Sequence, residues 1–586
     1  MEKLTQGDFI MIAHLSPISG IASYKDRYIA TAGYDNQVIL WDVVKNEGIA
    51  RGSHDHLANQ CRFSNDGKII VSSSSDHTAR VWQVPDMKLL AVLPNHQDDV
   101  ESVAISDDNR YIATCSRDHK IRTFTPEGKL IAELVGHEQD VISVEWMFNS
   151  YEIISSSDDG TVKKWHGLTG ALIENIELGD VETDTLIITR EGVIFAANDE
   201  GNIISIFGQE QNTFPAHKAG IKRLVYSEEQ QSIVSLSYDR QIKIWKIINK
   251  TAIEQSFVSN MPAIIWPRSC CFVGKNKLAF ATFGNTFALL DLASAKWETN
   301  HIEPTWGINA VLETNKGIYT VGDAGVVKLN GQPIQTLPSL CNFLTQFDNM
   351  ILTGGQTGQI FDAISGLVIY QHHSPLNCGT VFKLEKNKNS QVALIGTYTG
   401  EIVVIEKMNE LMGPTINNQK AISAIYTVKI QDNAIKSLAN DGKTLFSVSA
   451  TGQACWHALN NFQLQHQEPD AHDKIANGCT YLSPNCFASI SRDLKLRIWH
   501  GIASEVILSP HSFSIKCVTA TQQGRFIGTG SYGGFVAIWD TLRHQWIKTI
   551  RPTLSGISNI VEMLNHQGFW ASAYDGKVYP IYIEGN

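Results

Sequence analysis

A chain of 586 residues with 43% apolar and 18% charged residues is long enough for several domains and apolar enough to bury large cores. This composition excludes a disordered protein, and no stretch is apolar enough to predict a membrane span. The net charge of −11 disfavours electrostatic binding of nucleic acid over a broad surface. The first eight residues lack the basic and apolar regions of a signal peptide, so we expect cytoplasmic residence, or nuclear residence in a eukaryote.

A set of one His, one Ser or Thr, one Asp and one Trp recurs along the chain in this order. Three sets have identical spacing: His54, Ser72, Asp76 and Trp82; His137, Ser155, Asp159 and Trp165; and His217, Ser235, Asp239 and Trp245. The His lies one residue nearer to the Ser or Thr in two sets: His14, Thr31, Asp35 and Trp41; and His472, Ser489, Asp493 and Trp499. Two sets vary one member: His96, Thr114, Asp118 and Phe124; and His511, Thr529, Gly533 and Trp539. Recurrence about every 40 residues is the signature of a repeat architecture.

Each repeat predicts two strands joined by a tight turn. A short apolar run precedes the Ser or Thr, a polar turn carries the Asp, and a second β-rich run ends on the aromatic residue, as in Ile69–Trp82. The four side chains can then satisfy one another, because the Asp accepts from the imidazole and the hydroxyl accepts from the indole. Such a network would offset the cost of burying polar groups in a sheet packed on both faces.

These residues resemble the WD40 family of β-propellers. The four-residue sets match its structural His–Ser/Thr–Asp–Trp tetrad, Trp41-Asp42 and Trp539-Asp540 match its name-giving dipeptide, and Gly136-His137 matches its second dipeptide. The resemblance runs from about Gln6 to the end of the sequence. It implies blades of four antiparallel strands around a central channel.

Aligning the turns and the strands after them gives fourteen units, with the eleventh closing on Trp456. Rings of this kind contain about four to eight blades, so fourteen units divide into seven and seven. We therefore predict an all-β fold of two tandem seven-bladed WD40 propellers. The first spans residues 1–300, with an N-terminal closing strand at about 6–13. The second spans residues 301–586, with more degenerate repeats at 301–460.

Closure of the two rings leaves two arrangements open. The N-terminal strand has no blade of its own, Trp297–Ile302 forms an outer strand after the seventh unit, and the fourteenth unit lacks one. In the arrangement we favour, the N-terminal strand completes blade 7 and the Trp297 segment completes blade 14. In the other, the N-terminal strand reaches blade 14. Either would leave no sheet edge unpaired.

Units seven to eleven keep their turns but lose the tetrad, and insertions are expected at residues 406–421 and 460–470. Two interpretations remain open. The repeats have drifted because their neighbours support them, or their loops are free to form a partner site, since binding residues concentrate on loops of a rigid scaffold.

The recurring His and Asp residues are better explained as structure than as catalysis, because a catalytic dyad is needed only once. The sequence predicts no catalytic residue, no metal site and no cofactor. His372-His373 lacks a further ligand at suitable spacing. His56 is expected to be exposed, and Asp98-Asp99 to lie in a solvated loop. No phosphate-binding glycine motif precedes a helix.

The residue before each turn Asp is expected to be exposed at one rim of a propeller of this family. Seven of these positions are Tyr or Arg: Tyr34, Arg117 and Tyr238 in the first ring, and Tyr398, Arg492, Tyr532 and Tyr574 in the second. Tyr and Arg are enriched at interface hot spots. Tyr also packs well on neighbouring strands, so a structural role stays open at each single position. The set as a whole predicts a partner-binding rim.

The leading functional prediction is a non-enzymatic scaffold or adaptor subunit that binds one or more proteins and does not contact nucleic acid or membrane directly. One alternative is a non-catalytic activating subunit of an enzyme that modifies nucleic acid, for example tRNA. Another is an actin-filament disassembly cofactor, because the tandem architecture is similar to that of actin-interacting proteins. An enzyme acting on a small ligand at a channel mouth is a weaker alternative.

Overall fold

The structure is a computed structural model that describes residues 12–179, 181–250, 252–383, 391–407 and 422–583. The described residues form strands and turns without a helix, which confirms the predicted all-β class. No helix able to span a membrane therefore occurs among them. The chain divides into two compact units, Met1–Thr305 (unit 1) and Trp306–Asn586 (unit 2).

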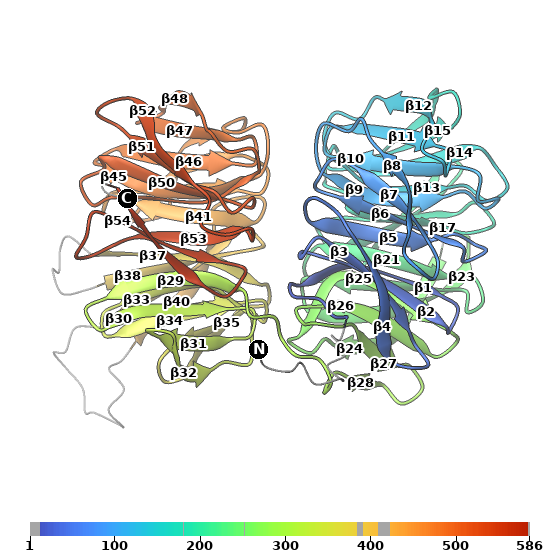
Figure 1. Cartoon of the computed structure of the whole chain (residues 1–586), viewed down its shortest axis with the longest axis horizontal. Coiled ribbons are helices and arrows are strands. Elements are labelled where there is room, and N and C mark those ends of the chain that lie inside the picture. Colours follow the sequence, from blue (N-terminus) through green and yellow to red (C-terminus); the bar gives the residue numbers. More distant parts are fainter. Residues whose placement is uncertain (1–11, 180, 251, 384–390, 408–421, 584–586) are drawn as a thin grey trace, which may run out of the picture. The chain divides into compact units, whose positions relative to one another are not determined.

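Unit 1 contains seven four-stranded antiparallel sheets within the described residues, and each sheet is built from four consecutive strands (Figure 1). Blades 1 to 7 are β1 (Ile18–Tyr24), β2 (Tyr28–Gly33), β3 (Gln37–Asp42), β4 (Glu47–Ser53); β5 (Ala58–Phe63), β6 (Ile69–Ser74), β7 (Ala79–Gln83), β8 (Leu89–Leu93); β9 (Val100–Ile105), β10 (Ile112–Ser116), β11 (Lys120–Phe124), β12 (Leu130–Val135); β13 (Val141–Trp146), β14 (Glu152–Ser157), β15 (Thr161–His166), β16 (Leu172–Glu177); β17 (Thr185–Ile188), β18 (Ile194–Ala197), β19 (Asn202–Phe207), β20 (Glu210–Pro215); β21 (Ile221–Ser227), β22 (Ser232–Ser237), β23 (Gln241–Asn249), β24 (Ala252–Asn260); and β25 (Ile265–Val273), β26 (Lys277–Thr282), β27 (Ala288–Asp291), β28 (Lys296–Glu298).

Unit 2 contains six four-stranded sheets and one three-stranded sheet in the part of the chain that the structure describes. Blades 8 to 14 are β29 (Ile308–Thr314), β30 (Gly317–Gly322), β31 (Val326–Leu329), β32 (Gln332–Thr336); β33 (Cys341–Phe347), β34 (Met350–Gly355), β35 (Gln359–Asp362), β36 (Val368–Gln371); β37 (Leu376–Lys383), β38 (Gln391–Thr397), β39 (Glu401–Lys407), β40 (Ile422–Lys429); β41 (Ile435–Asn440), β42 (Thr444–Ser449), β43 (Ala454–Ala458), β44 (Leu464–Glu468); β45 (Ala476–Ser483), β46 (Cys486–Ser491), β47 (Lys495–His500), β48 (Ala503–Leu508); β49 (Ile515–Ala520), β50 (Phe526–Ser531), β51 (Val536–Asp540), β52 (Gln545–Ile550); and β53 (Ile557–Glu562), β54 (Gly568–Ala573), β55 (Val578–Tyr582).

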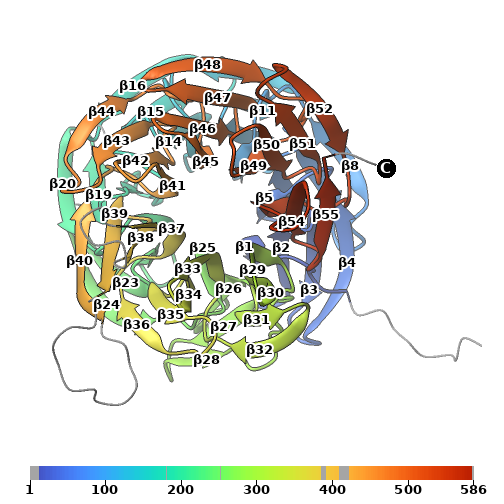
Figure 2. The same ribbon diagram turned by 90° about the vertical axis from the view of Figure 1, so that its left-hand side faces the viewer.

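In each unit the first strands of the blades contact one another in chain order, and the last contacts the first. In unit 1 the series β1, β5, β9, β13, β17, β21 and β25 closes on β1. In unit 2 the series β29, β33, β37, β41, β45, β49 and β53 closes on β29. The blades of each unit therefore form a closed ring, with the first strands innermost and the fourth strands outermost (Figure 2).

The favoured closing arrangement is wrong for the Trp297 segment. That segment forms β28, which pairs with β27 of its own blade in the register Leu290↔Trp297, because a short turn makes this local pairing the least costly in loop entropy. Of the predicted closing strand, residues 6–11 lie outside the described residues, and Ile12 forms an antiparallel bridge to Gly48 of blade 1. Blade 14 has three strands among the described residues.

The predicted insertion at 460–470 is also wrong, because β44 falls inside it and forms the ordinary fourth strand of blade 11. The other predicted insertion lies outside the described residues from 408 to 421. Its first residues, Glu406 and Lys407, end β39.

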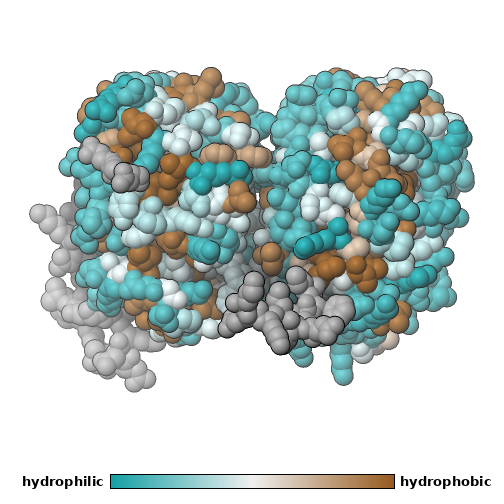
Figure 3. Space-filling model, viewed as in Figure 1, coloured by the Kyte–Doolittle hydropathy of each residue, from teal (hydrophilic) through white to brown (hydrophobic). Residues whose placement is uncertain are grey.

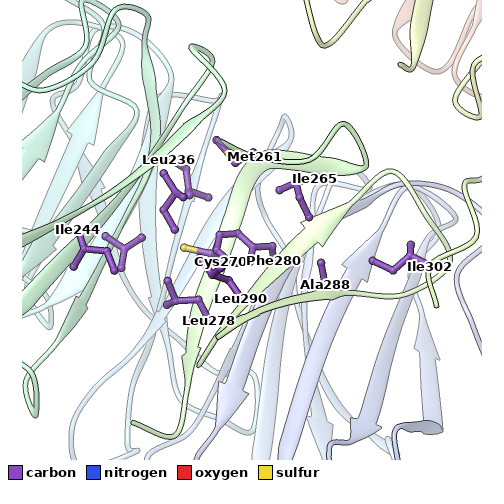
Figure 4. Close-up of a cluster of buried hydrophobic side chains, with 12 residues drawn as sticks. Leu236, Ile244, Met261, Ile265, Cys270, Leu278, Phe280, Ala288, Leu290 and Ile302 are labelled. Carbon is purple, nitrogen blue, oxygen red and sulfur yellow. The ribbon is translucent and has the colours of Figure 1, made fainter. Parts of the chain in front are cut away.

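The cores lie between neighbouring blades, because both faces of every sheet are covered. Figure 4 shows one of them, where Leu236 and Ile244 of blade 6 meet Cys270, Leu278 and Phe280 of blade 7. All six positions of β22 are buried, which accounts for its near-continuous run of small and apolar residues. Each fully buried Leu or Phe side chain contributes about 1.5–3 kcal/mol. The rings are thus rigid frames that present turns at their rims.

Candidate partner-binding rims

The tetrad side chains contact one another inside the blades. In blade 2, His54 Nδ1 lies 2.9 Å from Asp76, His54 Nε2 lies 2.8 Å from Ser72 Oγ, and Trp82 Nε1 donates to the same hydroxyl at 2.8 Å. The same three contacts occur in the sets that begin at His14, His137, His217 and His472. Each links the loop before a blade to its second and third strands, so the tetrad acts as an internal brace.

The charge states of the brace follow from its burial and its hydrogen bonds. Burial opposes ionisation of Asp76, but hydrogen bonds from His54 and Thr78 outweigh it and hold the pKa of Asp76 well below its usual range. Burial also lowers the pKa of His54 despite its bond to Asp76. In blade 2 the brace at neutral pH is thus a neutral imidazole on an ionised carboxylate, and Ser72, the hydroxyl beside it, is fully buried.

Blade 13 lacks the carboxylate of the brace. His511 Nε2 still lies 2.9 Å from Thr529 Oγ1, but Phe513 occupies the space that a side chain at Gly533 would need. Burial lowers the pKa of His511 to about 4, since no carboxylate supports its charged form. His511 Nδ1 and Trp539 Nε1 have no hydrogen-bond partner among the described residues.

Blade 10 rebuilds the brace from other residues. His372 Nε2 lies 3.1 Å from Glu401, and Thr399, at the turn position usually taken by Asp, donates to Glu401 at 2.9 Å. His373 Nε2 lies 3.8 Å from the same carboxylate, so three possible metal ligands fall within 4.8 Å of one another. The sequence prediction missed Glu401, because only the sheet register brings it beside the His pair.

In blade 11, His457 pairs with Leu445 at the position that the tetrad Trp has in other blades, so Trp456 lies one residue before that position.

A second group with metal-ligand spacing consists of His77, Asp98 and Asp99. Asp98 and Asp99 are buried, at 7% and 8% exposure, so the expectation that they are solvated is wrong. His56 is likewise buried at 7% exposure rather than exposed, because it lies at the start of the loop that enters β5. The inner loops of unit 1 therefore bury polar groups that sequence spacing alone places in solvent.

A β-bulge at the start of most first strands sends one side chain out of the ladder at the same rim. In blade 6 the register shifts between Ile221 and Arg223, which leaves Lys222 at the bulge. The corresponding residues are Ser19, Asn59, Glu101 and Ile142 in unit 1, and Asn309, Asn342, Asn377, Lys436, Asn477, Lys516 and Ser558 in unit 2. We call this the bulge position.

Neutral residues at the bulge position join one blade to the next. Asn342 donates to Leu376 O at 2.7 Å, and Asn377 donates to Ile435 O at 2.9 Å. Asn59, Asn477 and Ser19 make the same kind of bond to the first strand of the following blade. Asn or Ser at this position is therefore structural, and a charged residue there marks a departure from the structural pattern.

The charged bulge residues of unit 1 belong to a network of ion pairs. Arg117 donates to Glu101 at 2.6 Å and also pairs with Asp140, while Arg268 lies 3.2 Å from Glu101. The Arg268 guanidinium lies 5.6 Å from the Trp266 ring centre. Trp266 in turn meets Tyr34 edge to face at 5.1 Å. Tyr34 and Arg117 are thus half-buried and packed, which corrects the expectation that they are exposed.

Lys222 forms a second cluster with Asp184 and Asp199, and its Nζ lies 5.2 Å from the ring centre of Tyr238. Burial raises the pKa of Asp184 to about 7 although Lys222 favours the ionised form. Burial and the neighbouring carboxylate of Glu182 also raise the pKa of Asp158 well above its usual range. Burial and neighbouring carboxylates therefore disfavour full ionisation of the acidic groups at this rim of unit 1.

The corresponding rim of unit 2 is aromatic and cationic. Tyr532 and Tyr574 stack with ring centres 6.1 Å apart, and Lys436 Nζ lies 5.5 Å from the ring centre of Tyr398. All of the predicted rim residues of unit 2 are half-buried rather than exposed: Tyr398, Arg492, Tyr532 and Tyr574. Trp306 is 66% exposed. The prediction missed Lys436 and Lys516, because the bulge position is not visible in the sequence.

Exposed apolar residues do not define an equally distinct surface. Leu130 and Leu172 are 40% and 48% exposed and lie on outer strands β12 and β16. Figure 3 shows apolar side chains interspersed with polar ones on the face that it displays. The charged rims are therefore the better candidates for specific recognition.

The fold and the braces define a class. The family described as "WD domain, G-beta repeat" matches residues 7–42, 51–83, 87–124, 128–166, 208–246 and 504–540. The chain therefore contains six repeats of this family, five in unit 1 and one in unit 2, within a set of repeated antiparallel blades.

The proteins to which the chain is similar have names that describe varied roles. The chain is 24% identical over 256 residues to the ribosome biogenesis protein WDR12 homolog of Drosophila persimilis, covering 37% of this chain and 59% of that protein. It is 22% identical over 233 residues to the target of rapamycin complex subunit wat1 of Schizosaccharomyces pombe, covering 37% and 73%. It is 26% identical over 211 residues to the coronin-like protein of Saccharomyces cerevisiae, covering 31% and 30%. The chain thus spans about three fifths of the length of the WDR12 homolog. These WD-repeat relatives, one named as a complex subunit, support a protein-interaction scaffold.

Proposed function

We propose that the protein is a non-enzymatic adaptor whose unit 1 rim binds a basic segment of a protein partner. The observation that carries this proposal is the crowding of Asp140, Asp158 and Asp184, whose pKa values are all raised by burial. An arriving Lys or Arg would favour their ionised forms, and Asp158 Oδ1 has no hydrogen-bond partner among the described residues.

The same groups give little support to catalysis. The carboxylates of the described rim pair with Arg117 and Lys222 rather than with a nucleophile. The nearby thiol of Cys115 is buried, and burial raises its pKa well above the usual range, so it is a poor nucleophile. A binding surface for cations fits this arrangement better than a general acid–base pair.

Two experiments test the proposal. Affinity purification of the chain at native expression, followed by mass spectrometry, should yield a stoichiometric protein partner with a Lys/Arg-rich segment. A fluorescein-labelled oligo-arginine peptide should bind the purified chain and weaken with salt. Asp158→Asn should reduce this binding, whereas Asp107→Asn, at an exposed turn, should leave it unchanged. Equal binding by the two variants would rule out the unit 1 rim as the site.

The cationic rim of unit 2 favours one other candidate function. A non-catalytic subunit of an enzyme that modifies nucleic acid would use such cations, and co-purified RNA would favour this function.

The alternative of an actin-filament disassembly cofactor rests on tandem architecture alone, and a co-sedimentation assay with filaments would test it. Cytoplasmic residence is part of the proposal and can be tested by imaging.

A further inference from the structure

Unit 2 contains a counterpart of Lys222 at which other residues replace the two carboxylate partners of that lysine. Lys436 occupies the bulge position of β41, as Lys222 does in β21. In the preceding blade, Asp184 and Asp199 pair with Lys222, but Asn377 and Tyr398 stand at the corresponding places. The backbone bonds Asp199 N to Glu182 O and Tyr398 N to Pro375 O support this equivalence.

The surroundings of Lys436 differ from those of Lys222 in charge. Lys222 has two carboxylate partners, which raise its pKa well above the ordinary value despite burial. Burial, together with the positive charges of Lys516 and Arg492, lowers the pKa of Lys436 to about 7. Across the described ranges, neither Lys436 nor Lys516 has a hydrogen bond or ion pair with a carboxylate, and both side chains are half-buried. A half-buried cation held among like charges is stabilised by an anion.

The three cations come from three consecutive blades at one rim. Lys436 lies on β41, Arg492 follows β46, and Lys516 occupies the bulge position of β49. Between the two lysines, the bulge residue Asn477 is tied to Ile515 O at 2.7 Å and adds no charge. The first strands β41, β45 and β49 of these blades are neighbours at the inner side of the ring (Figure 2).

We propose that Lys436, Arg492 and Lys516 form a binding site for the phosphate group of a phosphorylated peptide. A phosphate dianion presents three acceptor oxygens, which match donors that converge from three blades. Arg pairs with phosphate in a bidentate fashion, and Tyr398 and Tyr532 supply flat surfaces for the flanking residues. This site is independent of the proposed binding of a basic segment at unit 1.

A phosphopeptide fits the site better than a nucleic acid does. Polynucleotide affinity depends on many phosphate contacts spread along a basic surface, whereas only three cations gather here on a chain of net charge −11. The other bulge positions of unit 2 are neutral: Asn309, Asn342, Asn377, Asn477 and Ser558. The positive charge at the bulge positions is thus confined to one sector of the ring, as a single phosphate requires.

Fluorescence anisotropy on the full chain tests the proposal with three labelled probes: a degenerate peptide pool with a central phosphoserine, the same pool unphosphorylated, and a 12-nucleotide single-stranded RNA. The phosphorylated pool should bind, and the other two should bind at least about tenfold more weakly. Lys436→Met and Lys516→Met should each weaken binding of the phosphorylated pool about tenfold or more. Lys443→Met is the matched control, because Lys443 is exposed in the turn at the other end of β41.

Each remaining outcome would overturn the proposal. Equal binding of the two peptide pools would remove the role of phosphate. Tighter binding of RNA would favour a nucleic-acid surface in its place. Unchanged binding by Lys436→Met and Lys516→Met would move the site elsewhere, and circular dichroism on each variant distinguishes loss of binding from loss of folding. Failure of the oligo-arginine experiment on unit 1 would leave these results unaffected.

Discussion

Lys222 in unit 1 and Lys436 in unit 2 occupy the same place in the same kind of blade, yet they face opposite electrostatic surroundings. Lys222 is paired with Asp184 and Asp199, whereas Lys436 is surrounded by other cations and by Tyr398. The backbone that presents them is common to both rings, since each occupies the bulge position at the start of a first strand. The comparison teaches that the braces determine the blade, while the rim residues beside the braces are free to diverge in charge.

Removing a brace should have the largest effect. Asp76→Ala removes the buried carboxylate that bonds the imidazole of His54 and the hydroxyl of Thr78. It should therefore lower the free energy of unfolding by about 1–3 kcal/mol. Urea denaturation followed by Trp fluorescence measures this loss. Asp107→Ala, at an exposed turn, is the control, and an Asp76→Ala variant as stable as that control would contradict the structural role of the tetrad.

Removing a rim residue of unit 1 should have a smaller but measurable effect on stability. Arg117 joins Glu101 and Asp140 across two blades, so Arg117→Ala should destabilise by about 1–2 kcal/mol. The sequence leaves a structural role open at each rim position, and the ion pairs give Arg117 such a role. Thermal unfolding of Arg117→Ala beside Tyr34→Ala tests it, because Tyr34 has an aromatic contact with Trp266 in place of the two ion pairs of Arg117.

The sequence predicts the braces better than the rims, for a physical reason. His54, Ser72, Asp76 and Trp82 meet because strand lengths and one tight turn determine their positions, and both are visible as spacing. The rim clusters depend on contacts between blades and on the bulge, which moves Lys222 or Lys436 out of the ladder without any local signal. Glu401 was missed for the same reason, since it reaches His372 only through the sheet.

The two rims should respond to pH in opposite directions. Binding of a cation to unit 1 favours ionised Asp158 and Asp184, so oligo-arginine affinity should rise between about pH 6 and 8, where Asp184, with a pKa of about 7, loses its proton. Glu182, Asp140 and Arg117 face these groups and contribute to the size of the change. An affinity that falls over this range would contradict the assignment.

Binding of a phosphate to unit 2 requires charged Lys436, whose pKa is about 7, so affinity for the phosphorylated pool should fall several-fold between pH 7 and 9. Phosphoserine is already mostly a dianion at pH 7 and changes little over this range. Lys516, Arg492, Tyr398 and the neutral thiol of Cys378 are the titratable groups around Lys436. Lys436→Met should flatten the profile.

The smallest expected effect is on the stability of unit 2. The pKa of Lys436 is lower in the folded chain, at about 7, than the ordinary 10.5, so its burial costs stability at pH 7 and less as pH rises toward 10. Lys436→Met should therefore raise the free energy of unfolding at pH 7 by ~1 kcal/mol. A destabilised Lys436→Met variant in thermal unfolding at pH 7 would show that the side chain is structural.

The central claim, that the two rims recognise opposite charges, is tested most directly by a reciprocal binding measurement on the full chain. The oligo-arginine peptide and the phosphorylated pool are each titrated by anisotropy against Asp158→Asn and against Lys436→Met. We expect Asp158→Asn to weaken only the basic peptide and Lys436→Met to weaken only the phosphorylated pool. If both variants weaken the same probe, or neither weakens its own, the rims do not have the separate roles assigned to them.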